Sequence, residues 1–314
     1  MALQNPDHVA GRRRGVVDRD HLYGGMDGQV VEKPPREYNY CDMWTSTFCP
    51  NFTIWSFTFL NVLAQIIIYI AELIHTSQTE EELNDFWFLG ISRETLQAFG
   101  MRMPWKIKDN GQVYRLISAL YVSQGMSQVF INGLVQMFAG FMLEAQMGSC
   151  RMMGFYLCVG ISANLFASTI NDWYAAGPEP AMFGMIAGLI GMYVYYWEKM
   201  GNDWCRKVCG LFLMIFLLVI GIFFLTAMAA PYKNYTKAFK ISYPDAAGFM
   251  GGCFFGLPMS WVFLVPTTGS IFKNAPRRDR GLFIAGLLIT MTLLLIMIVV
   301  FSFDNEPKDY WYYE

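Results

Sequence analysis

Long apolar stretches alternate with shorter polar segments along most of this chain. A helix needs about 20 apolar residues to cross the hydrocarbon core of a bilayer. Seven stretches reach or approach this length, at 54–74, 117–142, 151–170, 181–198, 208–230, 246–266 and 281–302. The pattern therefore predicts an all-α, polytopic membrane protein.

The fourth and sixth stretches are short and rich in glycine. Small residues at helical spacing allow two helix backbones to approach closely within a membrane. The fourth stretch has Gly184 and Gly188 at this spacing, and the sixth has Gly252 and Gly256. We expect these two helices to lie at the centre of the bundle, surrounded by protein rather than by lipid.

Three regions follow from the pattern. Residues 1–52 form a polar N-terminal tail, residues 53–266 form a six-helix membrane domain, and residues 267–314 hold a seventh helix and an acidic, aromatic tail. The loop at 75–116 is unusually long and mixes charged residues with apolar residues and tryptophans. Tryptophan favours the membrane–water interface, so we expect this loop to lie partly in that interface.

Composition agrees with a membrane protein. The 314 residues are 54% hydrophobic and 15% charged, whereas about a quarter of a soluble chain is charged. A net charge of −2 gives no concentrated basic face for a nucleic acid. Most of the 23 Lys and Arg residues fall on the side of the N-terminus, which predicts that this side faces cytosol or matrix. The organelle stays open between a secretory-pathway membrane and the inner mitochondrial membrane.

The residue types that bind metals are sparse. The seven cysteines show no paired spacing, and Cys205 with Cys209 supplies two thiols on one helix face, too few for a metal site. The three histidines are His8, His21 and His75, and none falls inside a predicted apolar stretch. We therefore expect no metal and no cofactor, and no histidine base within the membrane.

A carboxylate stands at the entrance of the fourth stretch, in the sequence AGPEPAMFGMIAG. Pro180 suits the first turn of a helix, which places Glu179 near the N-cap, after the turn at Gly177. There a carboxylate can accept unpaired backbone N–H groups and face the positive end of the helix dipole. The alternative is a functional role, since an ionisable group at membrane depth is a functional candidate.

Several segments, taken in order, resemble motifs of the rhomboids, a superfamily of intramembrane serine proteases. Residues 94–121 resemble the first-loop region, with Tyr114 and Arg115 where the family has Trp-Arg. GPEPAMFGMIAG resembles the Gly-x-Ser-Gly-Ala-x-x-Gly motif, and DAAGFMGGCFFG resembles Ala-His-x-x-Gly-x-x-x-Gly. The resemblance implies a rhomboid-like bundle of six helices with one extra C-terminal transmembrane helix, similar to eukaryotic secretory-pathway rhomboids.

The departures from these motifs bear on catalysis. By this resemblance, Glu179 stands at the nucleophile position, Phe249 at the histidine position, and Gln128 at the position of a second-helix histidine that helps to hold the oxyanion. Asn132, one turn after Gln128, is retained. A Ser–His mechanism needs both the hydroxyl and the imidazole, and losing such a unit costs about a millionfold in turnover. The resemblance thus implies a pseudoprotease that binds transmembrane proteins and lipids.

Two other interpretations stay open. In one, the chain is an accessory subunit of a large membrane complex, such as a respiratory complex, with partners contacting both polar tails. In the other, which the missing nucleophile disfavours, the chain is an unusual intramembrane hydrolase that uses Glu179.

Overall fold

The computed structural model describes residues 54–78, 90–197, 204, 208, 211, 212, 215, 219, 245–265 and 277–303. Within these residues the regular elements are helices, as the sequence predicts. They are α2 (Phe57–Gln78), α3 (Arg93–Phe99), α4 (Pro104–Lys108), α5 (Arg115–Ser118), α6 (Met126–Met147), α7 (Ser149–Ile170), α8 (Glu179–Tyr196), α11 (Ala246–Leu264) and α13 (Arg277–Phe303). Five of them, α2, α6, α7, α11 and α13, are long and apolar enough to cross a membrane.

Most of these helices begin and end within a few residues of the predicted stretches. The stretch at 117–142 is the exception, because α6 begins only at Met126. The apolar side chains of Leu116, Leu120 and Val122 are buried, but they belong to α5 and the turn after it. The single apolar stretch predicted at 117–142 therefore combines the buried turn after α5 with the separate helix α6. The predicted stretch at 208–230 and both polar tails lie outside the continuously described residues.

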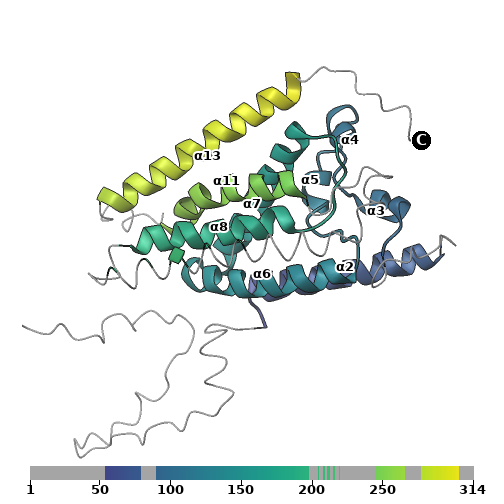
Figure 1. The fold of residues 1–314 in the computed structure, drawn as a ribbon, viewed down its shortest axis with the longest axis horizontal. Helices are drawn as coiled ribbons and strands as arrows, with labels where there is room; N and C mark the ends of the chain where they lie inside the picture. The colour runs from purple at the N-terminus through teal and green to yellow at the C-terminus, as the bar shows by residue number, and fades with distance from the viewer. Residues whose placement is uncertain are drawn as a thin grey trace, which may run out of the picture. The chain divides into compact units, whose positions relative to one another are not determined.

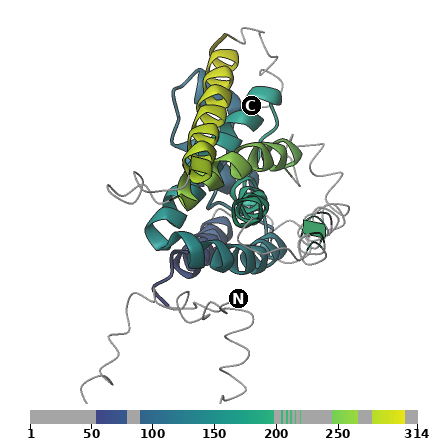
Figure 2. The same cartoon turned by 90° about the vertical axis from the view of Figure 1, so that its left-hand side faces the viewer.

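Helix α8 occupies the centre of the described bundle. It lies between α6 and α11, and the two views in Figures 1 and 2 agree on this arrangement. Every residue of α8 from Glu179 to Leu189 is buried, whereas α13 contacts the bundle on one side and is largely exposed. The expectation of a short, glycine-rich helix surrounded by protein holds for α8.

Glycines let α8 and α11 approach at backbone distance. A Cβ added at Gly252 would overlap the carbonyl oxygen of Pro180, and one at Gly256 would overlap the backbone of Gly184. On its other side, α8 meets α7, where a Cβ at Gly188 would lie 2.7 Å from the ring of Phe155. Without a hydrophobic driving force between helices in lipid, such close van der Waals contact is a main source of stability.

Buried polar groups attach α2 to the bundle. The carboxylate of Glu144, near the end of α6, accepts hydrogen bonds from the backbone N–H groups of Phe57 (2.7 Å) and Thr58 (2.9 Å). It therefore pairs N–H groups of the first turn of α2, which have no partner within the helix. Farther along, Gln65 donates to Gln136 on α6 (3.1 Å) and to Tyr156 on α7 (3.0 Å).

The first loop folds into short helices from residue 90 onward. Ser92 caps α3 by accepting from the N–H of Thr95, and Gly100 ends α3 in the left-handed conformation (φ 97°). Leu96, Met101 and Met103 are buried with Tyr69 of α2 and Tyr174 in a small apolar cluster. This part of the loop thus packs onto the bundle, and its position relative to a membrane interface stays a prediction.

The close contact between α8 and α11 predicts a matched pair of glycine substitutions. Gly256→Val should lower the free energy of unfolding by about 1–3 kcal/mol or more, because the new side chain would force the two backbones apart. Gly281→Ala, on α13, has open space around its Cβ and should be neutral or slightly stabilising. Thermal unfolding of both variants in the same detergent measures the difference. Equal stability would contradict the close packing.

Candidate functional site

A tight turn positions the start of α8. Gly177 has a φ of 145°, a conformation that L side chains rarely adopt, and a Cβ there would overlap the side chains of Glu179 and Gln128. Its N–H donates to the carbonyl of Ala119 at 2.9 Å. Two residues earlier, Ala175 pairs with Arg102 through two backbone hydrogen bonds of 2.8 and 3.1 Å. The first loop therefore holds the turn that carries Glu179.

The carboxylate of Glu179 is buried and bound by two amides from α6. Gln128 donates from Nε2 at 2.5 Å and Asn132 donates from Nδ2 at 3.1 Å, both to the same oxygen, Oε1. Glu179 is the first residue of α8, and Pro178 stands at the N-cap position. The sequence favoured a capping carboxylate. Pro178 makes no side-chain cap hydrogen bond, and the side-chain partners of the Glu179 carboxylate come from another helix, α6.

Gln128 connects this cluster to the turn that precedes α6 and to the turn that precedes α8. Its Oε1 accepts from the N–H of Gln124 at 2.6 Å, and its Nε2 also donates to the carbonyl of Ala176 at 2.8 Å. One side chain thus connects α6, the turn before α6 and the turn before α8. Gln128 and Asn132 share a helix face, as their spacing predicts, and both use that face to contact Glu179.

Phe249 lies against the same end of α8. Its ring meets that of Phe183 edge to face, with centroids 4.3 Å apart and planes at 84°. Such a contact contributes about 0.5–1.5 kcal/mol beyond the area it buries. Phe249 offers no polar atom to Glu179, so the α11 side of this site is apolar at the position where the resemblance implies a histidine.

A buried ion pair next to the site is a feature that the sequence interpretation missed. Arg102 of the first loop donates to both carboxylate oxygens of Asp245, at 2.5 and 3.1 Å, and to Asn164 Oδ1 of α7 at 3.2 Å. Arg102 is fully buried and Asp245 is 4% exposed. Asp245 stands immediately before α11, so the pair joins the first loop to the start of the helix that carries Phe249. In the sequence, Arg102 and Asp245 are each a single charged residue between apolar neighbours. That pattern was the available signal of charges that are buried and paired.

Tyr114 and Arg115 lie away from Glu179 in the first loop. Tyr114 is exposed, and its ring lies under the guanidinium of Arg115, 5.4 Å from centroid to Cζ. Arg115 donates to the carbonyl groups of Gln97 (3.1 Å) and Met101 (3.0 Å). Burial lowers the pKa of this guanidinium, which nonetheless stays charged at neutral pH. These contacts attach Arg115 to the backbone of the first loop.

The one histidine among the described residues lies at the end of α2. This helix extends to Gln78, four residues beyond the predicted apolar stretch, and so includes His75 in its last turn. The His75 ring lies 3.0 Å from the hydroxyl of Thr95 and packs edge to face on Phe99. Within the described residues, no group of three His, Cys, Asp or Glu side chains is placed to hold a metal.

The groups brought together are therefore a carboxyl, two amides and two aromatic rings. They can exchange hydrogen bonds and fill space, and the amides of Gln128 and Asn132 are committed to Glu179. The four positions Gln128, Asn132, Glu179 and Phe249 carry neither a hydroxyl nor an imidazole, the two groups of a Ser–His mechanism.

Comparison with known proteins finds similarity to rhomboid proteins. Residues 110–266 match the model of the Rhomboid domain. The chain is 24% identical to RHOMBOID-like protein 7 of Arabidopsis thaliana over 54% of this chain and 50% of that relative. It is 22% identical to RHOMBOID-like protein 6, mitochondrial, over 70% and 71% of the two chains. It is 27% identical to Inactive RHOMBOID-like protein 8 over 38% of this chain and 34% of the relative. Both of these relatives are also from Arabidopsis thaliana. This chain thus spans about half the length of the first of these relatives.

The ion pair next to the site predicts a non-additive pair of substitutions. Arg102→Met should lower the free energy of unfolding by about 3–5 kcal/mol, because it leaves Asp245 buried without its counter-charge. Asp245→Leu should have a comparable effect on its own. The double variant should be more stable than either single variant, since it removes both charges. Additive losses in a detergent-unfolding experiment would show that the two side chains do not depend on each other.

Proposed function

Because this chain belongs to the rhomboid family, we propose that it is a catalytically inactive member, a pseudoprotease that binds transmembrane segments of other proteins. The observation that carries this proposal is the position of Glu179. Its carboxylate stands at the motif position of the serine nucleophile and is held by Gln128 and Asn132. One of its relatives, Inactive RHOMBOID-like protein 8 of Arabidopsis thaliana, is named as an inactive member.

The geometry also argues against a hydrolase that uses Glu179. A nucleophile or base has to reach the scissile bond, but Glu179 is 2% exposed. The turn at Gly177 lies directly against it, so closely that a Cβ at Gly177 would overlap the carboxylate. Both amide donors bind the carboxylate oxygen itself, whereas an oxyanion site has to leave such donors available for the substrate.

Partner binding is supported by what the fold retains. Helix α6 presents Phe138 as an exposed apolar side chain on a helix long enough to cross a membrane. By resemblance, clients would dock between this helix and the fifth predicted stretch, 208–230. The close contact between α8 and α11 would support that surface without taking part in a reaction.

The proposal predicts no proteolysis. Purified protein in proteoliposomes, incubated with transmembrane peptides that an active rhomboid protease cleaves in parallel, should give no cleavage above the background. The Glu179→Gln variant should behave identically, because the carboxylate performs no chemistry. Cleavage by the wild type that disappears in Glu179→Gln would overturn the inactive assignment and favour the hydrolase.

Partner binding is tested by a photo-crosslinking residue at Phe138 of α6, with Leu288 of α13 as the matched exposed position. Adducts with single-span membrane proteins should form at 138 and be much weaker at 288. A defined set of partners at one fixed stoichiometry would identify an accessory subunit of a complex, whereas exchangeable partners would identify a client-binding protein. Equal labelling at both positions would contradict a specific partner surface on α6.

A further inference from the structure

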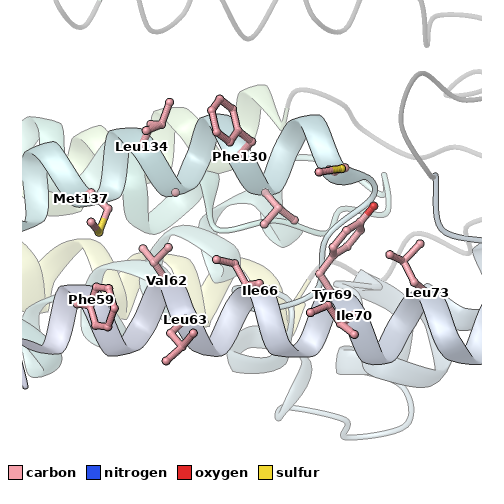
Figure 3. Close-up of a pocket in the computed structure, with 13 residues that line it drawn as sticks. Phe59, Val62, Leu63, Ile66, Tyr69, Ile70, Leu73, Phe130, Leu134 and Met137 are labelled. Atoms are coloured by element: carbon pink, nitrogen blue, oxygen red, sulfur yellow. The ribbon is translucent and has the colours of Figure 1, made fainter. Parts of the chain in front are cut away.

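An apolar groove runs along the outer side of α2 and α6, separate from the cluster around Glu179. Figure 3 shows the two helices side by side, with lining side chains from both of them. The groove encloses about 550 Å³ and extends on α2 from Phe59 to Leu73. Fourteen helical steps span about 21 Å, a large part of the roughly 30 Å hydrocarbon core of a bilayer.

Gly133 of α6 forms part of the lining. A Cβ at this position would lie 3.3 Å from Cγ1 of Val62 on α2, so the missing side chain lets the two helices approach here. Ile66, Ile70 and Phe130 line the groove and are exposed. The groove therefore opens along its length to whatever surrounds these two candidate membrane spans.

The chemistry of the lining discriminates between two possible occupants, a partner helix and the acyl chain of a lipid. Helices associate in lipid through small residues and interhelical hydrogen bonds, because lipid tails are as apolar as leucine. This groove offers one glycine, Gly133, and one hydroxyl, that of Tyr69, among large aliphatic, aromatic and Met side chains. Such a surface lacks the groups that bind a partner helix, but it provides continuous van der Waals contact for a flexible hydrocarbon chain.

We propose that the groove between α2 and α6 binds one acyl chain of a membrane phospholipid. The chain lies along the helices between Phe59 and Leu73 and fills the space beside Gly133. It completes the packing between α2 and α6 on the side where their side chains diverge. This site does not depend on the inactivity of the Glu179 cluster, and Phe138, the position that tests protein partners, is not among its lining residues.

Photolabelling with a defined lipid tests this site. The full chain is reconstituted in phosphatidylcholine vesicles that contain a trace of phosphatidylcholine with a diazirine near the end of one acyl chain. After irradiation, adducts are mapped by mass spectrometry. Peptides covering 59–73 and 126–137 should carry several times more label per residue than the exposed face of α13, which serves as the reference for an apolar helix surface. Equal labelling of these surfaces in the wild type would overturn the proposal.

A substitution that fills the groove provides the matched test. Ile66→Trp should reduce labelling of the groove peptides by about tenfold, the change expected from losing some ten close carbon–carbon contacts. Leu288→Trp, an equally apolar exposed position on α13, should leave groove labelling unchanged. Undiminished labelling in a folded Ile66→Trp protein would contradict the site, and the wild-type comparison stands if that variant does not fold. Protection of the groove by a co-reconstituted single-span peptide would assign it to a helix instead.

Discussion

The described fold depends on how it accommodates a carboxyl group inside the bundle. Leaving a buried polar group without a partner costs about 1–3 kcal/mol, and more for a charged one. Glu179 avoids much of this cost because Gln128 and Asn132 donate to it from the adjacent helix. These hydrogen bonds also fix the start of α8 against α6. The cluster, which by resemblance stands at the motif positions of a protease, thus acts as a structural connection between α6 and α8.

Other buried charged groups in the described bundle also bind partners from a different part of the chain. The Glu144 carboxylate pairs the first N–H groups of α2, and the Arg102–Asp245 ion pair attaches the first loop to the start of α11. Between these polar joints, helices meet through glycine, most closely where Gly252 and Gly256 of α11 face α8. Polar joints at the helix ends and glycine contacts along the helices together give the bundle a defined register. A scaffold of this kind can present apolar surfaces to lipids and to partner helices.

The sequence predicted much of the fold because apolar length and glycine spacing are local signals. It placed α7, α8 and α11 within two residues of their observed ends, and it predicted that α8 would be enclosed by protein. It failed at 117–142, where a buried turn is as apolar as the helix that follows it. Periodicity along one segment cannot distinguish burial in a loop from burial in a membrane.

The sequence indicated candidate residues for the site, but it did not indicate which of them contact each other. The spacing of Gln128 and Asn132 showed that they share a face, yet the partner of that face, Glu179, lies 47 residues from Asn132 along the chain. Arg102 and Asp245 are separated by 143 residues, so no local pattern could pair them. The tight turn at Gly177, which brings Glu179 to α6, depends on a hydrogen bond to Ala119 that forms only in the folded chain.

A double-mutant cycle on unfolding stability, using Asn132→Ala, Glu179→Ala and the combined variant, tests most directly whether Glu179 is a structural joint. The account predicts a coupling energy of about 1–3 kcal/mol, because Asn132→Ala removes one of the two amide donors to the buried carboxylate and Glu179→Ala leaves the Asn132 amide without its acceptor. Strictly additive losses would contradict it, since they would mean that the Glu179 carboxylate and the Asn132 amide do not depend on each other in the folded protein.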